Sequence, residues 1–493
     1  MKKYIIVRKG QYDDRFSFSA PQNIIVGRES IARLPEVLKE RGATISICTA
    51  KRDKGGPMER LYQFPLKQHS GAPSVPAVTP GERVLRGQRI ADKPENALGA
   101  NIFSSVTGTV QEVGEKSITV LADGTQSPDY VKLSSTEPLA LIEEAGIVGL
   151  GGAGFPTYAK LNRPFTEGGV VIVNAVECEP ILDHNIRAME KEAEKLVRGL
   201  KIVMEIMNAR RGVIAIKGKH TKAVEKLRAA LMAENISPET VSISLLPDMY
   251  PMGEKRAVVR ETLDRLLPME SSTREADAVL INSETVCRVW EAVALKKPMI
   301  DKDMTVAGKL RGNENLIQVF FDVPLGSSVQ QVFAQAGGLA EGYGELIMGG
   351  PFTGKRTSPE APVVKTTGGL IAAECFMKGP EKIGLLVCAC GAGKERLRQQ
   401  AESMGSEVAD IQYCKQAHEI KGSLRCENPG RCPGQVEKIL ALKKAGAQAV
   451  LISSCTDCSN TVMACAPKLG LPVYHCTDGA LRAVNQRLVR KIR

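Results

Sequence analysis

Residues 146–160 read Gly146-Ile-Val-Gly-Leu-Gly-Gly-Ala-Gly-Phe-Pro-Thr-Tyr-Ala-Lys160, and this stretch decides how the rest of the chain is interpreted. Its glycines leave a turn with almost no side chains, so backbone N–H groups can approach a phosphate or a flat ring closely. Phe155 and Tyr158 add aromatic faces, and Lys160 adds a positive charge. The alternative interpretation is a tight loop before a helix, which a single glycine-rich run does not exclude.

Polar loops follow several of the predicted strands. The run Gly169–Val173 leads into the residues NAVECEP, which place Asn174, Glu177 and Glu179 at the carboxyl end of a strand. Open α/β sheets bind their ligands at this edge. The residues YPMGEK at 250–255 and Asn282, which ends another apolar run, supply two further loops.

Strands and helices alternate through the middle of the chain. The apolar runs predict strands at 169–174, 212–217, 241–246 and 278–282, and amphipathic helices at 187–208 and 221–234. This alternation predicts an α/β fold, a parallel sheet with helices on both faces. Before it, β-branched runs with Pro-Gly and Thr-Gly turns at 64–73, 80–90 and 104–110 indicate hairpins. After it, a strand at 316–326, a helix at 328–336 and a strand at 345–350 suit a small β-grasp domain.

Three separated motifs carry a family resemblance. The segments GLGGAGFPTYAK (149–160), NAVECEP (174–180) and YPMGEK (250–255) resemble the C subunit of the Rnf electron-transport complex and, more distantly, the flavin subunit of respiratory complex I. The resemblance implies a site for FMN and NADH. The cofactor-binding residues that it implies are Gly151, Gly152, Gly154, Lys160, Asn174, Glu177, Glu179, Tyr250, Gly253, Glu254 and Asn282.

The resemblance also implies a multidomain α/β organisation. The hairpins resemble the barrel-sandwich hybrid of biotinyl and lipoyl carriers, and a soluble-ligand-binding β-grasp (SLBB) module follows the flavin domain in the related families. The predicted division is an N-terminal α/β extension (1–60), a barrel-sandwich hybrid (61–133), a Rossmann-like FMN- and NADH-binding domain (134–298), the β-grasp domain (299–375) and a cysteine-rich α/β redox domain (381–493). We assign no function to the extension.

Cysteine is concentrated near the end of the chain. Of 13 cysteines, nine lie within the last 106 residues, a clustering that indicates metal or redox chemistry. Two predicted strands, 384–387 and 449–453, deliver cysteine pairs into turns, and thiols at a helix N-terminus have a lowered pKa. The predicted metal ligands are Cys388, Cys390, Cys414, Cys432, Cys455 and Cys458.

The spacing of these cysteines departs from the ferredoxin-type runs of the Rnf protein. It resembles the proline-reductase-associated electron-transfer proteins of amino-acid-fermenting anaerobes. Three chemistries stay open: an iron–sulfur cluster of the [2Fe–2S] type, a dithiol relay through Cys455 and Cys458, and structural zinc. The cluster is our first choice.

We therefore expect a flavoprotein that oxidises NADH and passes electrons through its cysteine centre to a partner reductase. The resemblance implies a D-proline reductase as this partner. The alternatives are an Rnf-type or cobalamin-reductase-type subunit, and a non-enzymatic thiol or metal scaffold.

Composition bears on location and partners. The chain has 493 residues and a net charge of +11. No apolar run reaches the ~18 residues of a membrane span, so we expect a cytoplasmic protein, with a peripheral membrane position as the alternative. The basic C-terminal region lacks interleaved aromatics, which favours an acidic redox partner over nucleic acid.

Overall fold

The computed structural model describes residues 6–7, 45–46, 60–312 and 316–490. The chain divides into two units, Met1–Met58 and Glu59–Arg493. In the first, strands β1 (Ile6–Val7) and β2 (Ile45–Ser46) pair antiparallel. For the N-terminal extension, the apolar runs predict strands at 23–26 and 44–48 around a helix at 31–41. Strand β2 lies within 44–48, and the other two segments lie outside the described residues. Everything below concerns the second unit.

Short strands form the first module of this unit, as the turn-rich sequence predicts. They are β3 (Leu61–Pro65), β4 (Val75–Pro76), β5 (Arg83–Val84), β6 (Arg89–Asp92), β7 (Ile102–Phe103), β8 (Gly108–Val113) and β9 (Ser117–Ala122). One sheet has the order β3-β9-β8-β5 and the other β4-β6-β7. Phe64, Ile90 and Ile118 are fully buried between them. This apolar core continues into residues 299–373, where Val306 and Phe333 belong to the same cluster.

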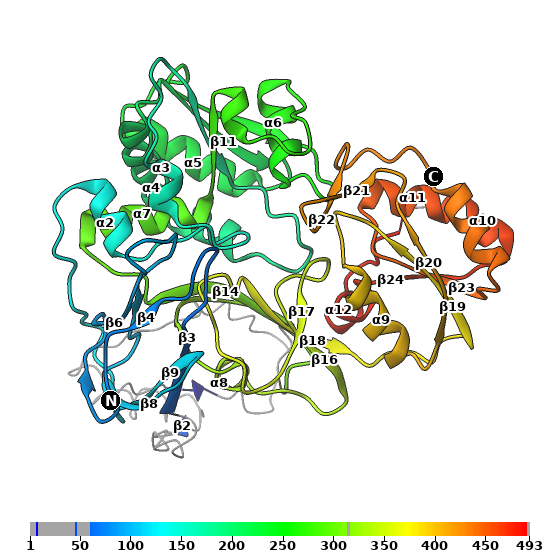
Figure 1. The fold of residues 1–493 in the computed structure, drawn as a ribbon, viewed down its shortest axis with the longest axis horizontal. Coiled ribbons are helices and arrows are strands. Elements are labelled where there is room, and N and C mark those ends of the chain that lie inside the picture. Colours follow the sequence, from blue (N-terminus) through cyan, green and yellow to red (C-terminus); the bar gives the residue numbers. More distant parts are fainter. Residues whose placement is uncertain (1–5, 8–44, 47–59, 313–315, 491–493) are drawn as a thin grey trace. The chain divides into compact units, whose positions relative to one another are not determined.

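The central domain is the predicted parallel α/β layer (Figure 1). Its elements are α2 (Pro138–Glu144), α3 (Thr157–Leu161), β10 (Val170–Asn174), α4 (His184–Met207), β11 (Arg211–Lys217), α5 (Thr221–Ala233), β12 (Val241–Leu246), α6 (Lys255–Leu263), β13 (Ala278–Asn282) and α7 (Ser283–Leu295). The strand order is β12-β11-β10-β13, and all three pairings are parallel. Asn174 and Asn282 are register partners at the carboxyl edge of β10 and β13. The sheet therefore brings two of the predicted polar loops together.

A mixed sheet with one helix follows. It contains β14 (Asp301–Gly308), β15 (Ile317–Pro324), α8 (Val329–Gln335), β16 (Tyr343–Met348), β17 (Lys355–Thr357) and β18 (Gly369–Glu374). The order is β15-β14-β18-β16-β17, with β14 and β18 parallel. The predicted strand–helix–strand sequence is present, while the β-grasp assignment itself stays a prediction.

The C-terminal module is a second small parallel sheet. It contains β19 (Lys382–Val387), α9 (Lys394–Ser403), β20 (Glu407–Tyr413), the hairpin β21 (Ala417–Ile420) and β22 (Ser423–Cys426), α10 (Val436–Lys444), β23 (Ala449–Ile452), α11 (Thr456–Cys465), β24 (Val473–His475) and α12 (Asp478–Ala483). Strands β19 and β23 are parallel neighbours in the order β20-β19-β23-β24. The cysteines that follow these two strands therefore emerge at one edge.

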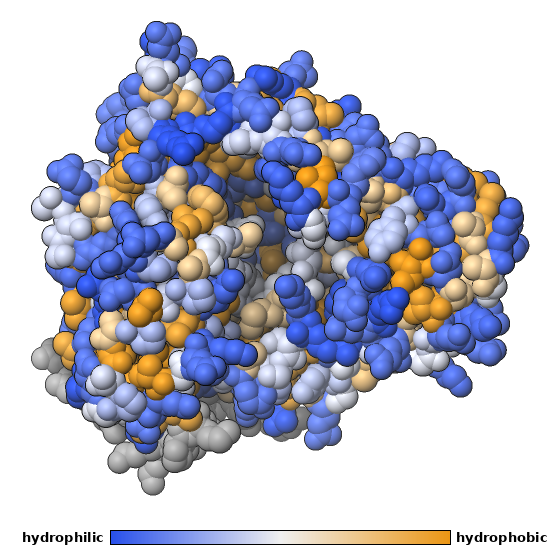
Figure 2. All heavy atoms as spheres, in the orientation of Figure 1, coloured by the Kyte–Doolittle hydropathy of each residue, from blue (hydrophilic) through white to orange (hydrophobic). Residues whose placement is uncertain are grey.

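No helix in the described part of the chain is long and apolar enough to cross a membrane. The surface is mostly hydrophilic and is hollowed near its centre in the view of Figure 2.

Candidate functional site

A cavity of about 880 Å³ lies at the carboxyl edge of the central sheet, and we call it the glycine-loop cavity. Most of the predicted cofactor-binding residues line it, namely Gly151, Gly152, Asn174, Glu177, Glu179, Tyr250, Gly253, Glu254 and Asn282. These residues come from four loops that are far apart in the sequence. The cavity volume falls within the roughly 300–1,000 Å³ that ligand sites occupy.

The glycines of the loop have different roles. A Cβ on Gly152 would meet nothing within 4 Å, so this position faces open space. A Cβ on Gly151 would lie 2.5 Å from the Asn282 amide nitrogen, so only glycine allows the loop to approach that side chain. Among the described residues, the N–H groups of Gly151 and Gly152 have no hydrogen-bond acceptor. Free N–H groups on a loop without side chains suit a phosphate or a ring carbonyl.

Two of the predicted cofactor-binding residues lie outside this cavity. Gly154, at φ +68°, packs against the first module, where a Cβ would meet the Cα of His69 at 3.0 Å. Lys160 is half-buried, and its amine donates to the Leu280 carbonyl at 3.2 Å. Burial lowers the pKa of Lys160. The sequence pattern did not separate glycine needed for packing from glycine needed for a ligand.

The two carboxylates of NAVECEP make different contacts. Glu179 accepts hydrogen bonds from the N–H groups of Phe352 and Thr353, at 2.7 and 2.9 Å, and from the Thr353 hydroxyl at 2.6 Å. Its hydrogen-bonding capacity is therefore used to hold the loop after β16. Within the described part of the chain, Glu177 accepts from Glu179 N at 3.1 Å and from the Asn185 amide at 3.3 Å. Burial, reinforced by the Glu179 charge, raises the pKa of Glu177 to about 7.

Other polar residues of the cavity also shape the loops. Asn282 caps α7 by accepting from Glu284 N and Thr285 N, and Glu254 caps α6 in the same way. Asn174 donates to the Gly253 carbonyl at 2.9 Å. The Tyr250 ring is stacked on Phe352, with centroids 3.7 Å apart. These side chains hold the cavity wall in place before any ligand binds.

The C-terminal module closes the cavity, which the sequence did not predict. Cys390, Arg425 and Cys426 line it together with the glycine loop. The central domain holds both cysteines by their carbonyls, because Tyr250 OH donates to Cys390 O and Arg256 donates to Cys426 O. Cys426 was absent from the predicted ligand set because the sequence analysis predicted neither a motif nor a strand at this position, whereas in the structure it ends β22.

Thiols of the C-terminal module contact one another in two separate sets. In the first, Cys388 is in hydrogen-bonding contact with Cys390 and Cys414, and Cys390 with Cys426. We call Cys388, Cys390, Cys414 and Cys426 the four-thiol group. Hydrogen bonds from the Cys390 and Cys414 thiols lower the pKa of Cys388.

The second set is a pair. Cys432 is in hydrogen-bonding contact with Cys458, an interaction that lowers the pKa of Cys432 to about 6. Cys455, predicted to pair with Cys458, instead directs its backbone N–H at the Cys388 sulfur. The structure thus brings Cys458 together with Cys432 rather than with Cys455.

Within the described residues, no group of three or more His, Cys, Asp or Glu side chains is arranged to hold a metal ion. A structural zinc site needs four ligands around one ion. The side chains of the described residues are not grouped in this way, so the structure does not support the zinc alternative. A [2Fe–2S] centre instead places two protein ligands on each iron. The pairwise contacts of the four-thiol group suit that requirement.

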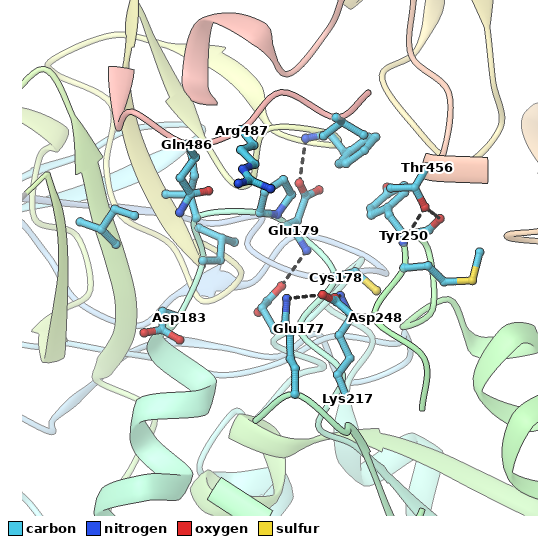
Figure 3. A pocket seen from close by; sticks show the side chains of 18 of the residues that line it. Glu177, Cys178, Glu179, Asp183, Lys217, Asp248, Tyr250, Thr456, Gln486 and Arg487 are labelled. Atoms are coloured by element: carbon cyan, nitrogen blue, oxygen red, sulfur yellow. Dashed lines mark hydrogen bonds and ion pairs between the residues drawn. The ribbon is translucent and has the colours of Figure 1, made fainter. Parts of the chain in front are cut away.

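A second cavity, of about 1330 Å³, lies on the other side of the NAVECEP loop (Figure 3). Glu177, Cys178, Glu179 and Tyr250 line both cavities and separate them. Lys217 and Asp248 form an ion pair of 3.1 Å on the wall of the second cavity. Burial raises the pKa of Cys178 to about 12, so this thiol stays neutral between the two cavities.

Comparisons with known families match the first two modules. Residues 142–291 match the family described as the Nuo51 FMN-binding domain, and residues 48–127 match the RnfC barrel sandwich hybrid domain. The predicted flavin domain and barrel-sandwich module are thereby confirmed as domain types.

Curated relatives cover most of the chain. The C subunit of the proton-translocating ferredoxin:NAD(+) oxidoreductase complex of Clostridium ljungdahlii is 30% identical over 62% of this chain and 69% of its own length. The C subunit of the ion-translocating oxidoreductase complex of Rhodobacter capsulatus is 32% identical over 68% and 67%. The cobalamin reductase of Salmonella typhimurium is 34% identical over 49% of this chain and 51% of its own. Among solved structures, an NAD+-reducing [NiFe]-hydrogenase gives a TM-score of 0.41 at 21% identity, covering 48% of this chain and 46% of its own.

Proposed function

Because the chain belongs to the family of C subunits of Rnf-type ion-translocating oxidoreductase complexes, we propose that it oxidises NADH at FMN and relays the electrons to its own C-terminal cysteines. The observation that carries this proposal is the shared cavity wall. Cys390 and Cys426 line the same cavity as Gly151 and Gly152. A ligand held by the glycine loop is therefore next to redox-active sulfur, with no separate domain in between.

The residues of the glycine-loop cavity fit FMN. The free N–H groups of Gly151 and Gly152 and the open space beside Gly152 support contact with the cofactor, together with Asn174 and Asn282. Lys355 and Arg425 bring positive charge to the lining, which suits a phosphate. Gly154 and Lys160 are left out of this set because neither lines the cavity. When bound, FMN accepts a hydride and releases electrons singly.

Glu177 is the acidic residue that we assign to the nicotinamide nucleotide. It borders both cavities and is not engaged by the β16–β17 loop, unlike Glu179. Its carboxylate oxygens are able to accept further hydrogen bonds from sugar hydroxyls. The role of Glu179 is then to hold the loop that walls the cavity.

Four cysteines are proposed to carry the electrons onward. The mutual contacts of Cys388, Cys390, Cys414 and Cys426 support their assignment as ligands of a [2Fe–2S] cluster. Cys426 thereby joins the predicted ligand set. Cys432, Cys455 and Cys458, which the sequence also predicted as ligands, are left out of this proposed set, because Cys432 and Cys458 contact each other and Cys455 contributes its backbone N–H.

The partner is proposed to be a reductase, and specifically a D-proline reductase that makes 5-aminovalerate. This specificity rests on the cysteine arrangement alone, which departs from ferredoxin-type spacing. The basic character of the last quarter of the chain, where residues 381–493 hold 17 Lys and Arg against 10 Asp and Glu, supports an acidic docking partner.

An anaerobic titration tests the proposal. Purified chain, reconstituted with FMN and iron, is expected to show flavin bands that bleach with one equivalent of NADH. The matched variant Gly152→Ala should bleach less, because its methyl group occupies the cavity. A chain that stays colourless after reconstitution would refute the assignment and leave a thiol scaffold as the remaining explanation.

A second candidate is a subunit that serves a membrane complex or cobalamin. The relatives named as ion-translocating complex subunits and as a cobalamin reductase favour it. The acceptor distinguishes the candidates. NADH-dependent turnover with purified D-proline reductase, but not with cobalamin or ferredoxin, is expected for the first proposal, and the reverse result for the second.

A further inference from the structure

Cys432 and Cys458 form a thiol pair that the cavity chemistry does not use. Their thiols contact each other, and neither residue lines the glycine-loop cavity or the second cavity. Cys432 lies in the loop after β22, and Cys458 lies in the first turn of α11. The Cys432 N–H donates to the Asp457 carboxylate at 2.7 Å, which fixes this loop against the start of the helix.

Hydrogen-bond donors surround the Cys432 sulfur. Gly434 N and the Gln435 side-chain amide each donate to it at 3.4 Å, and the Thr461 hydroxyl, which donates to the Cys458 carbonyl at 2.9 Å, lies 3.6 Å from it. Donors directed at one sulfur stabilise its thiolate, which is the attacking species in thiol–disulfide exchange. The described residues place no such set of donors around Cys465, at the other end of α11, whose thiol donates to the Val462 carbonyl.

The two thiols differ in exposure. Cys432 is partly exposed, whereas Cys458 is 1% exposed. A partly exposed thiol next to a buried one suits exchange with an external disulfide, because the exposed sulfur attacks that disulfide first and the buried sulfur then resolves the mixed disulfide.

One side chain joins this pair to the four-thiol group. The Gln435 amide, which is fully buried, donates both to Cys432 and to Cys414, the latter at 3.2 Å. The pair is therefore separated from the four-thiol group by a single amide, while the four-thiol group reaches the cavity through Cys390 and Cys426.

We propose that Cys432 and Cys458 are a redox-active dithiol through which electrons leave the chain to a disulfide of a partner protein. The proposal rests on the proposed function, because NADH is the electron source. NADH, one proton and the Cys432–Cys458 disulfide give NAD+ and two thiols. The Cys432 thiolate then attacks the partner disulfide, Cys458 displaces the partner, and the partner leaves with two thiols while the internal disulfide forms again.

Differential alkylation of the full-length holoprotein tests this. Oxidised protein should yield a Cys432–Cys458 disulfide peptide in mass spectrometry, and an excess of NADH, enough to reduce the flavin, the cluster and the disulfide, should convert both cysteines to alkylated thiols. With a disulfide-bonded model protein as acceptor, Cys432→Ser should lower NADH-dependent reduction at least about tenfold. Flavin bleaching and iron content should not change in this variant. Cys458→Ser should instead accumulate a mixed disulfide at Cys432.

Cys465→Ser is the matched control, since it removes a thiol from the same helix without touching the pair, and it should behave as wild type. The proposal is overturned if no Cys432–Cys458 disulfide forms under oxidation, or if Cys432→Ser loses iron. Opening of this disulfide by dithiothreitol but not by NADH would keep the dithiol assignment and refute the NADH-dependent function. The two failures are thus distinguishable.

Discussion

At the scale of single residues, Glu177 and Glu179 have opposite consequences for stability although they are two positions apart. The pKa of Glu177 is raised to about 7, so between about pH 4.5 and 7 the folded chain binds more protons than the unfolded chain. Stability contributed by this group therefore falls as pH rises through that window. Glu177→Gln should be close to wild type at pH 5 and more stable by about 2–3 kcal/mol at pH 8.

Glu179→Gln is the comparison for this experiment. An amide nitrogen in place of a carboxylate oxygen would face the N–H groups of Phe352 or Thr353, so this variant should be destabilised by about 2–4 kcal/mol at both pH values. Denaturant unfolding at the two pH values measures both effects. Equal effects of the two substitutions on the free energy of unfolding would contradict the different roles assigned to Glu177 and Glu179.

The glycine loop offers a second prediction at this scale. Gly154→Ala forces alanine into a left-handed conformation against the first module and should cost about 1–3 kcal/mol of stability. Gly152→Ala meets no protein atom, so its stability should not change, while FMN affinity should fall about tenfold. Thermal unfolding and fluorescence titration with FMN separate the two. If Gly154→Ala lost FMN affinity without losing stability, the assignment of Gly152 to FMN and of Gly154 to packing would be wrong.

At the scale of elements, helix α6 holds the hairpin β21–β22 over the cavity. Arg256 donates to the carbonyls of Leu267 and Glu427, at 2.7 and 2.6 Å, and to that of Cys426. Arg256→Met leaves these carbonyls without their donor and should cost about 2–4 kcal/mol. NADH should still bleach the flavin in this variant, whereas electron transfer to the cysteines should slow.

Stopped-flow spectroscopy of flavin re-oxidation measures that step. Arg398→Met, on the exposed side of α9, is the control for loss of an arginine and should leave the rate unchanged. A slower NADH half-reaction in Arg256→Met would mean that α6 serves the nucleotide rather than the hairpin.

At the scale of the whole second unit, the fully buried Lys365 joins three modules. Its amine donates to the carbonyls of Asn101 at 2.6 Å and Gly146 at 2.7 Å. Burial lowers the pKa of Lys365 to about 7, so between about pH 7 and 10.5 the unfolded chain binds the additional proton. Stability should therefore rise with pH across this window.

Lys365→Met removes this titration. The stability of wild type relative to the variant should increase by about 2–4 kcal/mol from pH 7 to pH 10, since each pKa unit corresponds to about 1.4 kcal/mol. Chemical denaturation of both proteins at the two pH values gives this difference. A difference that does not change with pH would mean that Lys365 is neutral throughout or charged throughout.

The central sheet was predictable from local sequence because its strands are short apolar runs between amphipathic helices. Strands β10, β11, β12 and β13 lie within one residue of the predicted ranges. The polar residues that follow these strands also reached the predicted edge, since parallel strands end at the same side of a sheet. The hairpins of the first module followed from their turn residues for a similar reason.

By itself, then, the sequence determined the α/β layer, the loops at its carboxyl edge and the concentration of cysteines in the last module, because each of these features depends on residues that are neighbours in the sequence. Only the tertiary structure decided which residues from distant segments of the chain meet. It placed Gly154 and Lys160 outside the cavity, bound Glu179 to the loop at Phe352, brought Cys426 to Cys390 and paired Cys458 with Cys432. The physical reason is that such contacts join segments up to about 170 positions apart, as between Glu179 and Phe352. A local pattern of apolar and polar residues cannot predict contacts over such distances.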